Sequence, residues 1–216
     1  NQGMILAYSY RDERGKHYHP SDVQEEKDGR MVVSGTGTEL FSQVEKMSKS
    51  KKNVIDPNIL LDQYGADVTR LFCLFAAPPE RDLEWSDQGV EGSYRFLNRV
   101  WNLAVKWIEV IKDAEPFNGS PGELDGTIRD LYKKTHQTIK KVTIDIDERF
   151  HFNTVISAVM ELVNTMYGIS PEEKSSNAAG VMRFSMESVI LLLSPIIPHF
   201  TEELWEVLGH KSSILL

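Results

Sequence analysis

The chain has 216 residues, of which 41% are hydrophobic and 26% charged, and its formal net charge is −8. This length is enough for one or two domains with a hydrophobic core. The negative charge excludes a uniformly basic nucleic-acid binder, so any contact with RNA must use a local basic patch. No stretch is long and apolar enough to cross a membrane, and we expect a cytoplasmic monomer without a secretory leader.

The single cysteine, Cys73, excludes an internal disulfide and fits a reducing compartment. It lies between Phe72 and Leu74 in an apolar run. This setting predicts a buried thiol rather than a reactive one.

Residues 1–45 predict a small antiparallel sheet. An apolar strand begins at Met4, Asp28-Gly29 forms a hairpin turn, and a second turn lies at 35–38. His17 and His19 are too isolated to be a metal pair, because no cysteine or further histidine is nearby. We therefore expect no metal site.

The next stretch, 46–52, contains four lysines and two serines in the order Lys-Met-Ser-Lys-Ser-Lys-Lys. Lysine offers a flexible point charge with three donors, and hydroxyl and backbone N–H groups add hydrogen bonds to phosphate oxygens. The loop therefore suits a polyphosphate. By composition alone, a run of this kind is more often a solvated loop or a basic targeting patch.

Two short helices are predicted after this loop. Asp56 suits an N-cap with Pro57 at the first helical position, and Gly65 suits the end of that helix. A second helix is expected from about Ala66, and the prolines at 78–79 terminate it.

Apolar residues recur at steps of three and four from residue 90 onward, which predicts long amphipathic helices. The stripe of the first helix consists of Val90, Tyr94, Leu97, Trp101, Ala104, Ile108 and Ile111. A second helix is expected over 124–147, with an inner stripe of Ile128, Leu131, Thr135, Ile139, Val142 and Ile146.

Residues 152–167 are apolar nearly all round, which predicts a helix in the middle of a bundle. A capping box at 170–173 predicts a helix from Pro171, and a last helix is expected over 200–208. The predicted fold class is mainly α: a helical bundle preceded by a small β-containing segment.

Basic residues on two of these helices are candidates for RNA contact. Arg95 and Arg99 are one turn apart and lie off the apolar stripe. Arg129, Lys133, His136 and Lys140 form a stripe along the second helix. Either set can hold a run of phosphates or can be an ordinary solvated helix face.

Several blocks of sequence together resemble class I aminoacyl-tRNA synthetases, and leucyl-tRNA synthetases in particular. These blocks are the loop Lys46-Met47-Ser48-Lys49-Ser50 with Asn53-Val54-Ile55-Asp56-Pro57, then 64–72, 76–87, 89–101 and 194–205. The valine and isoleucine enzymes usually carry Leu-Gly-Asn after the lysine-serine loop, whereas this chain carries Lys51-Lys52-Asn53. The resemblance covers nearly the whole chain.

The resemblance implies a division into three parts. Residues 1–55 would end a nucleotide-binding catalytic domain, with the small sheet and the ATP loop. Residues 56–88 would be connecting helices that contact the tRNA stem, and 89–216 would be the anticodon-binding helical bundle.

The resemblance also implies site residues and partners. Lys49 would be catalytic, and the ATP-binding residues would be Lys46, Met47, Ser48, Lys49 and Ser50. The substrates would be ATP, with Mg as its counter-ion, leucine and tRNA(Leu). The tRNA contacts would be Arg95, Arg99, Arg129, Lys133 and Lys140.

The family's histidine-containing ATP motif, leucine pocket and editing domain have no counterpart in this sequence. We therefore expect an excised piece of a leucine–tRNA ligase that is inactive alone and carries no bound cofactor. Two alternatives stay open: a free-standing RNA-binding helical module, and a structural bundle whose lysine loop has no function.

Overall fold

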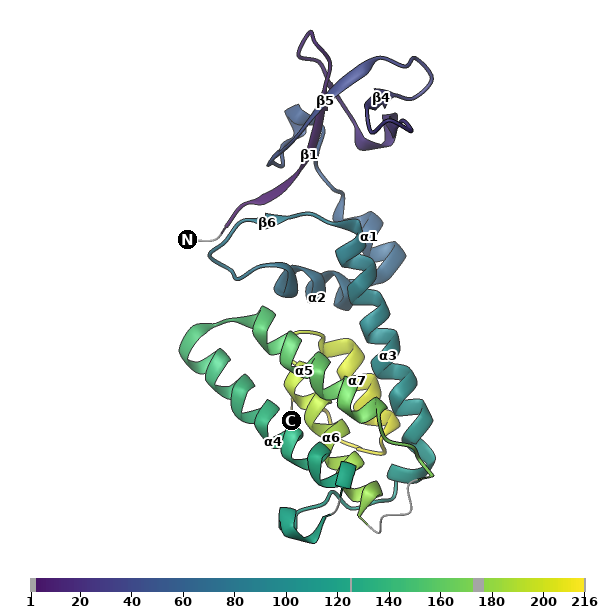
Figure 1. The fold of residues 1–216 in the computed structure, drawn as a ribbon, viewed down its shortest axis with the longest axis vertical. Helices are drawn as coiled ribbons and strands as arrows, with labels where there is room; N and C mark the ends of the chain where they lie inside the picture. Colours follow the sequence, from purple (N-terminus) through teal and green to yellow (C-terminus); the bar gives the residue numbers. More distant parts are fainter. Residues whose placement is uncertain (1–2, 125, 173–176, 216) are drawn as a thin grey trace.

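The computed structural model describes residues 3–124, 126–172 and 177–215. It places a twisted sheet at one end of an elongated molecule and a helical bundle at the other, with two short helices between them (Figure 1). The predicted fold class, a mainly α bundle preceded by a β-containing segment, is confirmed.

The sheet is built on two long antiparallel strands, β1 (Ile5–Arg11) and β5 (Glu39–Lys46). The full order is β2-β1-β5-β4-β3, with β2 at His17–Tyr18, β3 at Val23–Glu25 and β4 at Met31–Val33. A short strand β6 (Leu83–Glu84) runs parallel to β1 and ties the sheet to the helical part. Leu6 lies opposite Lys46 in the register, so β1 supports the place where the lysine loop leaves the sheet.

The turns predicted in this sheet are confirmed. Gly29 has φ 83° in the hairpin between β3 and β4, and Gly35 has φ 80° after β4. Positive φ is cheap only for glycine, which explains why glycine occupies both turns.

The two linking helices are α1 (Pro57–Tyr64) and α2 (Ala66–Ala76). The Asp56 carboxylate accepts the Asn58 N–H at 2.9 Å, so the predicted N-cap is confirmed. Gly65, at φ 82°, ends α1 and precedes α2 directly. Positive φ is cheap for glycine, so the chain passes from α1 into α2 at this residue without a longer loop.

Helix α3 (Asp87–Ile111) is the longest element, and the Ser86 hydroxyl caps it by accepting the Gly89 N–H at 3.1 Å. Its buried face differs from the predicted stripe. Tyr94 is 46% exposed, and Trp101 and Ile108 are only half-buried. The residues buried in their place are Ser93, Phe96, Val100, Leu103 and Trp107, alongside Val90, Leu97, Ala104 and Ile111.

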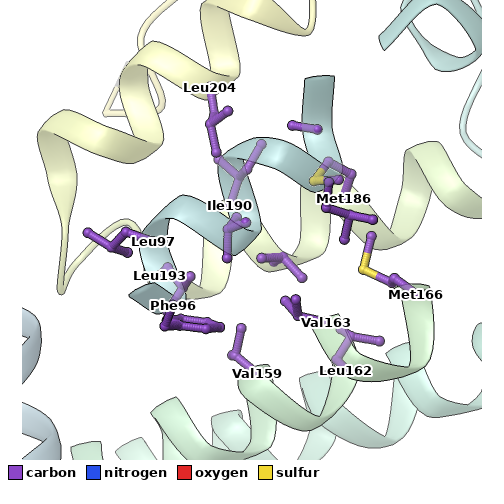
Figure 2. Close-up of a cluster of buried hydrophobic side chains, with 14 of the residues drawn as sticks. Phe96, Leu97, Val159, Leu162, Val163, Met166, Met186, Ile190, Leu193 and Leu204 are labelled. Carbon is purple, nitrogen blue, oxygen red and sulfur yellow. The ribbon is translucent and has the colours of Figure 1, made fainter. Parts of the chain in front are cut away.

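The bundle consists of α3 with α4 (Gly126–Arg149), α5 (Phe152–Tyr167), α6 (Ala178–Leu193) and α7 (Pro198–Val207). Helix α5 packs against α4, α2, α3 and α6, which confirms its predicted central place. Figure 2 shows α5 side chains such as Val159, Leu162 and Met166 meeting Ile190 and Leu193 of α6.

Some predicted helix boundaries are wrong. Pro171 and Glu172 form a turn, and α6 begins only at Ala178. Glu173 of the predicted capping box lies outside the described residues. In α4, the residues of the predicted inner stripe are buried, except Ile139 and Ile146, which are half-buried. The last helix begins at Pro198 rather than Phe200, since proline fits the first helical position.

Cys73 is exposed, so the prediction of a buried thiol is wrong. Helix α2 turns Val68, Leu71 and Phe72 toward the core and Cys73 away from it. An apolar run on a helix always places some members on the outer face, because consecutive residues differ by about 100°.

Polar contacts join helix α2 to the turn between α6 and α7 and to the first turn of α7. The Asp67 carboxylate accepts the Phe200 N–H at 2.6 Å and the His199 Nδ1–H at 3.0 Å. Arg70 donates to the Ile196 and Pro195 carbonyls at 2.8 and 3.1 Å. This clamp, Asp67 with Arg70, joins the segment that carries the lysine loop to the far end of the chain.

A buried arginine closes the other end of the bundle. Arg183 of α6 donates from Nη1 to the carbonyls of Ile111, Lys112 and Leu208, at 3.2, 3.2 and 2.7 Å. Its Nε donates to Glu187 at 2.5 Å. Carbonyls at helix ends have no partner within the helix, so one guanidinium satisfies the ends of both α3 and α7.

We expect Arg183→Met to lower the free energy of unfolding by about 3 kcal/mol or more. The substitution removes the side-chain donor to the Lys112 and Leu208 carbonyls, and among the described residues it leaves the Glu187 carboxylate with His210 alone at 2.8 Å. Urea unfolding followed by circular dichroism measures the change. Arg14→Met, at an exposed arginine of the sheet, is the control and should stay within about 0.5 kcal/mol of the original chain.

Candidate functional site

The lysine loop, residues 46–53, leaves the end of β5 and turns through a short 3₁₀ helix, η2 (Lys49–Lys51). The Met47 N–H donates to the Ile5 carbonyl at 3.1 Å, so the sheet hydrogen bonding continues into the loop. The Ser48 hydroxyl caps η2 by accepting the Lys51 N–H at 3.4 Å and lies 3.1 Å from the Ser50 hydroxyl. The two serines therefore fix the shape of the turn.

The side chain of Asn53 binds the loop to the sheet. It is only 1% exposed, and its side-chain oxygen accepts the Ser48 N–H at 2.9 Å. Its amide nitrogen donates to the carbonyls of Ala7 and Glu45, at 3.2 and 3.4 Å. One buried side chain thus binds β1, β5 and the start of η2 together, and leaves no buried amide group unpaired.

Glu45 and Lys51 form a second fastening. The Lys51 ammonium contacts one oxygen of the Glu45 carboxylate, and the Ser9 hydroxyl donates to the other at 2.5 Å. Hydrogen bonding to Lys51, then to Ser9, lowers the pKa of Glu45 to about 2. The Glu45 carboxylate thus neutralises one of the four lysine charges of the loop, that of Lys51.

Lys46 and Lys49 are different, because both are exposed and neither takes part in an ion pair within the described residues. Lys52 has φ 54°, a left-handed backbone that ends η2. Met47 is half-buried. The arrangement therefore holds the backbone of the loop at several points while two cationic side chains stay available for an anion.

The predicted RNA-contacting residues fall into two regions of the bundle. On α3, Arg95 is exposed and pairs weakly with Glu91 one turn away, at 3.3 Å. Arg99 donates to the Asn164 side chain at 2.7 Å and lies over the Tyr167 ring, 5.1 Å from its centroid. Arg99 is therefore already fixed against α5, whereas Arg95 is adjustable.

On α4, Lys133 and Lys140 are exposed and have no ion-pair partner among the described residues. Arg129 is half-buried and engaged. His136 packs edge-on to Tyr132 at 4.5 Å between ring centroids. Lys133 and Lys140 are thus the most available cations of the predicted stripe.

Within the described ranges, no group of three or more metal-ligating side chains occurs, and no helix has the length and apolar character needed to span a membrane.

Comparison with known proteins places these features in one family. Residues 32–86 match the model "tRNA synthetases class I (I, L, M and V)", and residues 129–216 match "Anticodon-binding domain of tRNA ligase". The chain is 56% identical over 214 residues to a leucine–tRNA ligase of Desulfatibacillum aliphaticivorans, covering 99% of this chain and 25% of that protein. It is 51% identical over 215 residues to the enzyme of Syntrophus aciditrophicus, covering 99% and 24%.

The chain belongs to the leucyl-tRNA synthetase family. Among solved structures it is similar to the agnB2 LeuRS of Agrobacterium radiobacter K84, in a ternary complex with tRNA and LeuAMS. That likeness has a TM-score of 0.71 and 27% identity, and covers 99% of this chain and 23% of that one. The chain spans about a quarter of the length of these leucyl-tRNA synthetases.

Sequence analysis missed two residues that hold the loop of this leucyl-tRNA synthetase segment. Asn53 was noted only as part of a motif, and Glu45 was not noted at all. Both act through contacts with β1, more than thirty residues earlier in the chain. A long-range partner of this kind leaves no periodic signal in the sequence.

We expect the carboxyl of Glu45 to titrate near pH 2, and to titrate at higher pH, toward an ordinary glutamate value, in Lys51→Gln. A lowered pKa means that the pair stabilises the fold above the unfolded-state pKa, and that this stabilisation is lost as pH falls toward 2. Carbon-13 NMR of the glutamate carboxyls follows the titration. An unchanged midpoint in Lys51→Gln would contradict the assignment of the cause.

Proposed function

We propose that the chain is the ATP-loop and tRNA-binding part of a leucine–tRNA ligase. In this role Lys49 is the catalytic cation, and Lys46, Met47, Ser48 and Ser50 complete the ATP-binding loop. The observation that carries the proposal is the contrast within the loop: its backbone is fixed by Asn53, while Lys46 and Lys49 stay exposed and unpaired in the described structure.

The chemistry of amino-acid activation needs such a loop. The leucine carboxylate attacks the α-phosphorus of ATP, the bond from that phosphorus to the bridging oxygen breaks, and pyrophosphate leaves. Negative charge therefore grows on the bridging oxygen and the departing phosphates. A cation and N–H donors placed there stabilise this charge more in the transition state than in the ground state. Mg²⁺ would accompany ATP as its counter-ion.

The fixed backbone of the loop supports this role for Lys49. A flexible lysine on a disordered loop would lose conformational entropy whenever it met the phosphate, and that loss would reduce its contribution. Here the bonds of Asn53 and the Glu45–Lys51 pair order the backbone in advance. Only the side chain of Lys49 remains to be ordered.

The helical bundle would contact tRNA(Leu) through its backbone and shape. Arg95 and Arg99 on α3 and Arg129, Lys133 and Lys140 on α4 are the proposed phosphate contacts. The availability of Arg95, Lys133 and Lys140 supports this proposal, as does the similarity to a LeuRS whose structure contains tRNA. In an acidic chain, isolated basic positions of this kind favour a local contact over general attraction to RNA.

We expect Lys49→Gln, in a full-length ligase that carries this segment, to slow leucine-dependent pyrophosphate exchange by roughly a hundredfold or more. The substitution removes a charge that acts in the transition state, so the loss should fall mainly on kcat. Pyrophosphate exchange at varied ATP concentrations separates the effects on kcat and KM.

Lys52→Gln is the matched control, because it removes one positive charge from the same loop at a residue that ends η2. It should retain most of the exchange rate. Equal losses in the two variants would show that only the total charge of the loop matters, and would contradict a specific role for Lys49.

We expect the double variant Lys133→Gln, Lys140→Gln to bind tRNA(Leu) more weakly and with a shallower salt dependence. Each neutralised phosphate releases counterions, so losing two contacts should reduce the slope of log K against log salt by about 2. Filter binding or fluorescence anisotropy at several salt concentrations measures this slope.

Lys27→Gln, Lys211→Gln is the control, since both lysines are exposed and lie outside the proposed contacts. It should leave the slope unchanged. The same slope in all three proteins would remove α4 from the proposed tRNA interface.

A further inference from the structure

A groove with a volume of about 630 Å³ opens at the junction of α1, α2, α3 and α7, and none of its lining residues belongs to the lysine loop. Four of its lining residues carry large aromatic rings: Tyr64 from α1, Tyr94 and Trp101 from α3 and Phe200 from α7. Polar groups of Asp67, Asn98 and His199 also line it. The groove lies in the part of Figure 1 where α3 passes the ends of α1 and α2.

The aromatic rings of the groove are only partly used for packing. Tyr64 and Tyr94 meet edge to face with ring centroids 5.8 Å apart, and Trp101 and Phe200 lie 6.2 Å apart at 60°. Tyr94 is nevertheless 46% exposed. Tyr94 and Trp101 are the residues that the helical spacing predicted to be in the core. The sequence thus supplies an apolar face that this part of the structure does not cover.

The polar groups at the groove have hydrogen-bonding capacity left. The Asn98 amide nitrogen donates to the Tyr94 carbonyl at 3.0 Å, and among the residues that the structure describes its second N–H and its oxygen have no partner. His199 donates from Nδ1 to Asp67, so in the neutral ring Nε2 is an acceptor. The His199 side chain is 79% exposed. An amide with both a donor and an acceptor free matches the edge of a nucleobase.

The charges around the groove favour a phosphodiester beside that base. Arg95 follows Tyr94 on α3, and its side chain is 67% exposed, with only the weak surface pair to Glu91. The N-terminal ends of α2 and α7 both open at the groove, and helix N-termini carry partial positive charge. The Asp67 carboxylate is shielded by the Phe200 N–H and by His199.

We propose that this groove binds one unpaired nucleobase of an RNA strand. The base stacks against the aromatic rings of Tyr94 and Trp101, Asn98 hydrogen-bonds to its edge, and Arg95 contacts the adjoining phosphate. This inference rests on the proposed function, because it makes the tRNA-binding surface specific at one nucleotide. Aromatic stacking with an amide at the base edge is the usual way in which proteins hold unstacked RNA bases.

A pentamer of adenosine ribonucleotides and an abasic pentamer of the same charge test the proposal. Both probes carry a 5′ fluorophore, and anisotropy with the 216-residue chain gives their dissociation constants at low salt. We expect the adenosine pentamer to bind about tenfold more tightly than the abasic one, because stacking of one base is lost in the latter. Equal affinity for the two probes would overturn the proposal.

Substitutions locate the binding. Tyr94→Ala and Asn98→Asp should each remove most of the preference for the adenosine pentamer. Both residues are exposed, and circular dichroism checks that the variants stay folded. The control is Phe41→Ala, which removes an aromatic ring that is 58% exposed on β5, away from the groove. It should retain the preference, and an unchanged preference in Tyr94→Ala would overturn the proposal.

Two further measurements separate this inference from the proposed function. Unaltered, salt-dependent binding of tRNA(Leu) by Tyr94→Ala would overturn the groove proposal and leave the wider tRNA contact standing. Pentamer binding by the 216-residue chain, but not by a full-length ligase carrying the same segment, would mean that protein fills the groove. That result would also overturn the proposal.

Discussion

The arrangement of the molecule depends on the clamp between α2 and the turn before α7. Asp67 accepts hydrogen bonds from His199 and Phe200 at the start of α7, and Arg70 donates to two carbonyls of the turn before it. These groups are more than one hundred residues apart in the chain. Because α2 follows the lysine loop and α1 directly, the clamp fixes the loop-bearing segment against the helical bundle, and a proposed ATP contact is held in a set relation to a proposed tRNA contact.

The lysine loop combines a rigid base with free charges. Asn53 binds the Ser48 N–H and two carbonyls of the sheet, and Glu45 pairs with Lys51. Lys46 and Lys49 are left for an external anion among the residues described. A loop that was cationic but unattached would bind a polyphosphate less selectively, because its charges would have no defined geometry. In the proposed role of the loop, the positions of its lysines therefore count as well as their number.

The sequence predicted those features that depend on neighbouring residues. The cap at Asp56, the end of α1 at Gly65 and the central helix over 152–167 follow from local chemistry and periodicity. The buried face of α3 was misjudged, because its apolar residues cover more than one stripe and spacing alone cannot say which stripe meets the bundle. Asn53 and Asp67 could not be assigned, since their partners are distant in the chain. Asp67 fits a helix N-terminus by composition, yet it serves a second helix as well.

The length of α3 has a consequence of its own. Its 25 residues span about 37 Å as one uninterrupted rod, from the strand β6 to the far end of the bundle. A single inserted residue near its middle would turn everything beyond it by about 100°, whereas four inserted residues would nearly restore the phase and add about 6 Å. The length of α3 therefore sets both the distance and the relative rotation between the segments at its two ends. Relatives that differ here in length should differ in multiples close to whole turns.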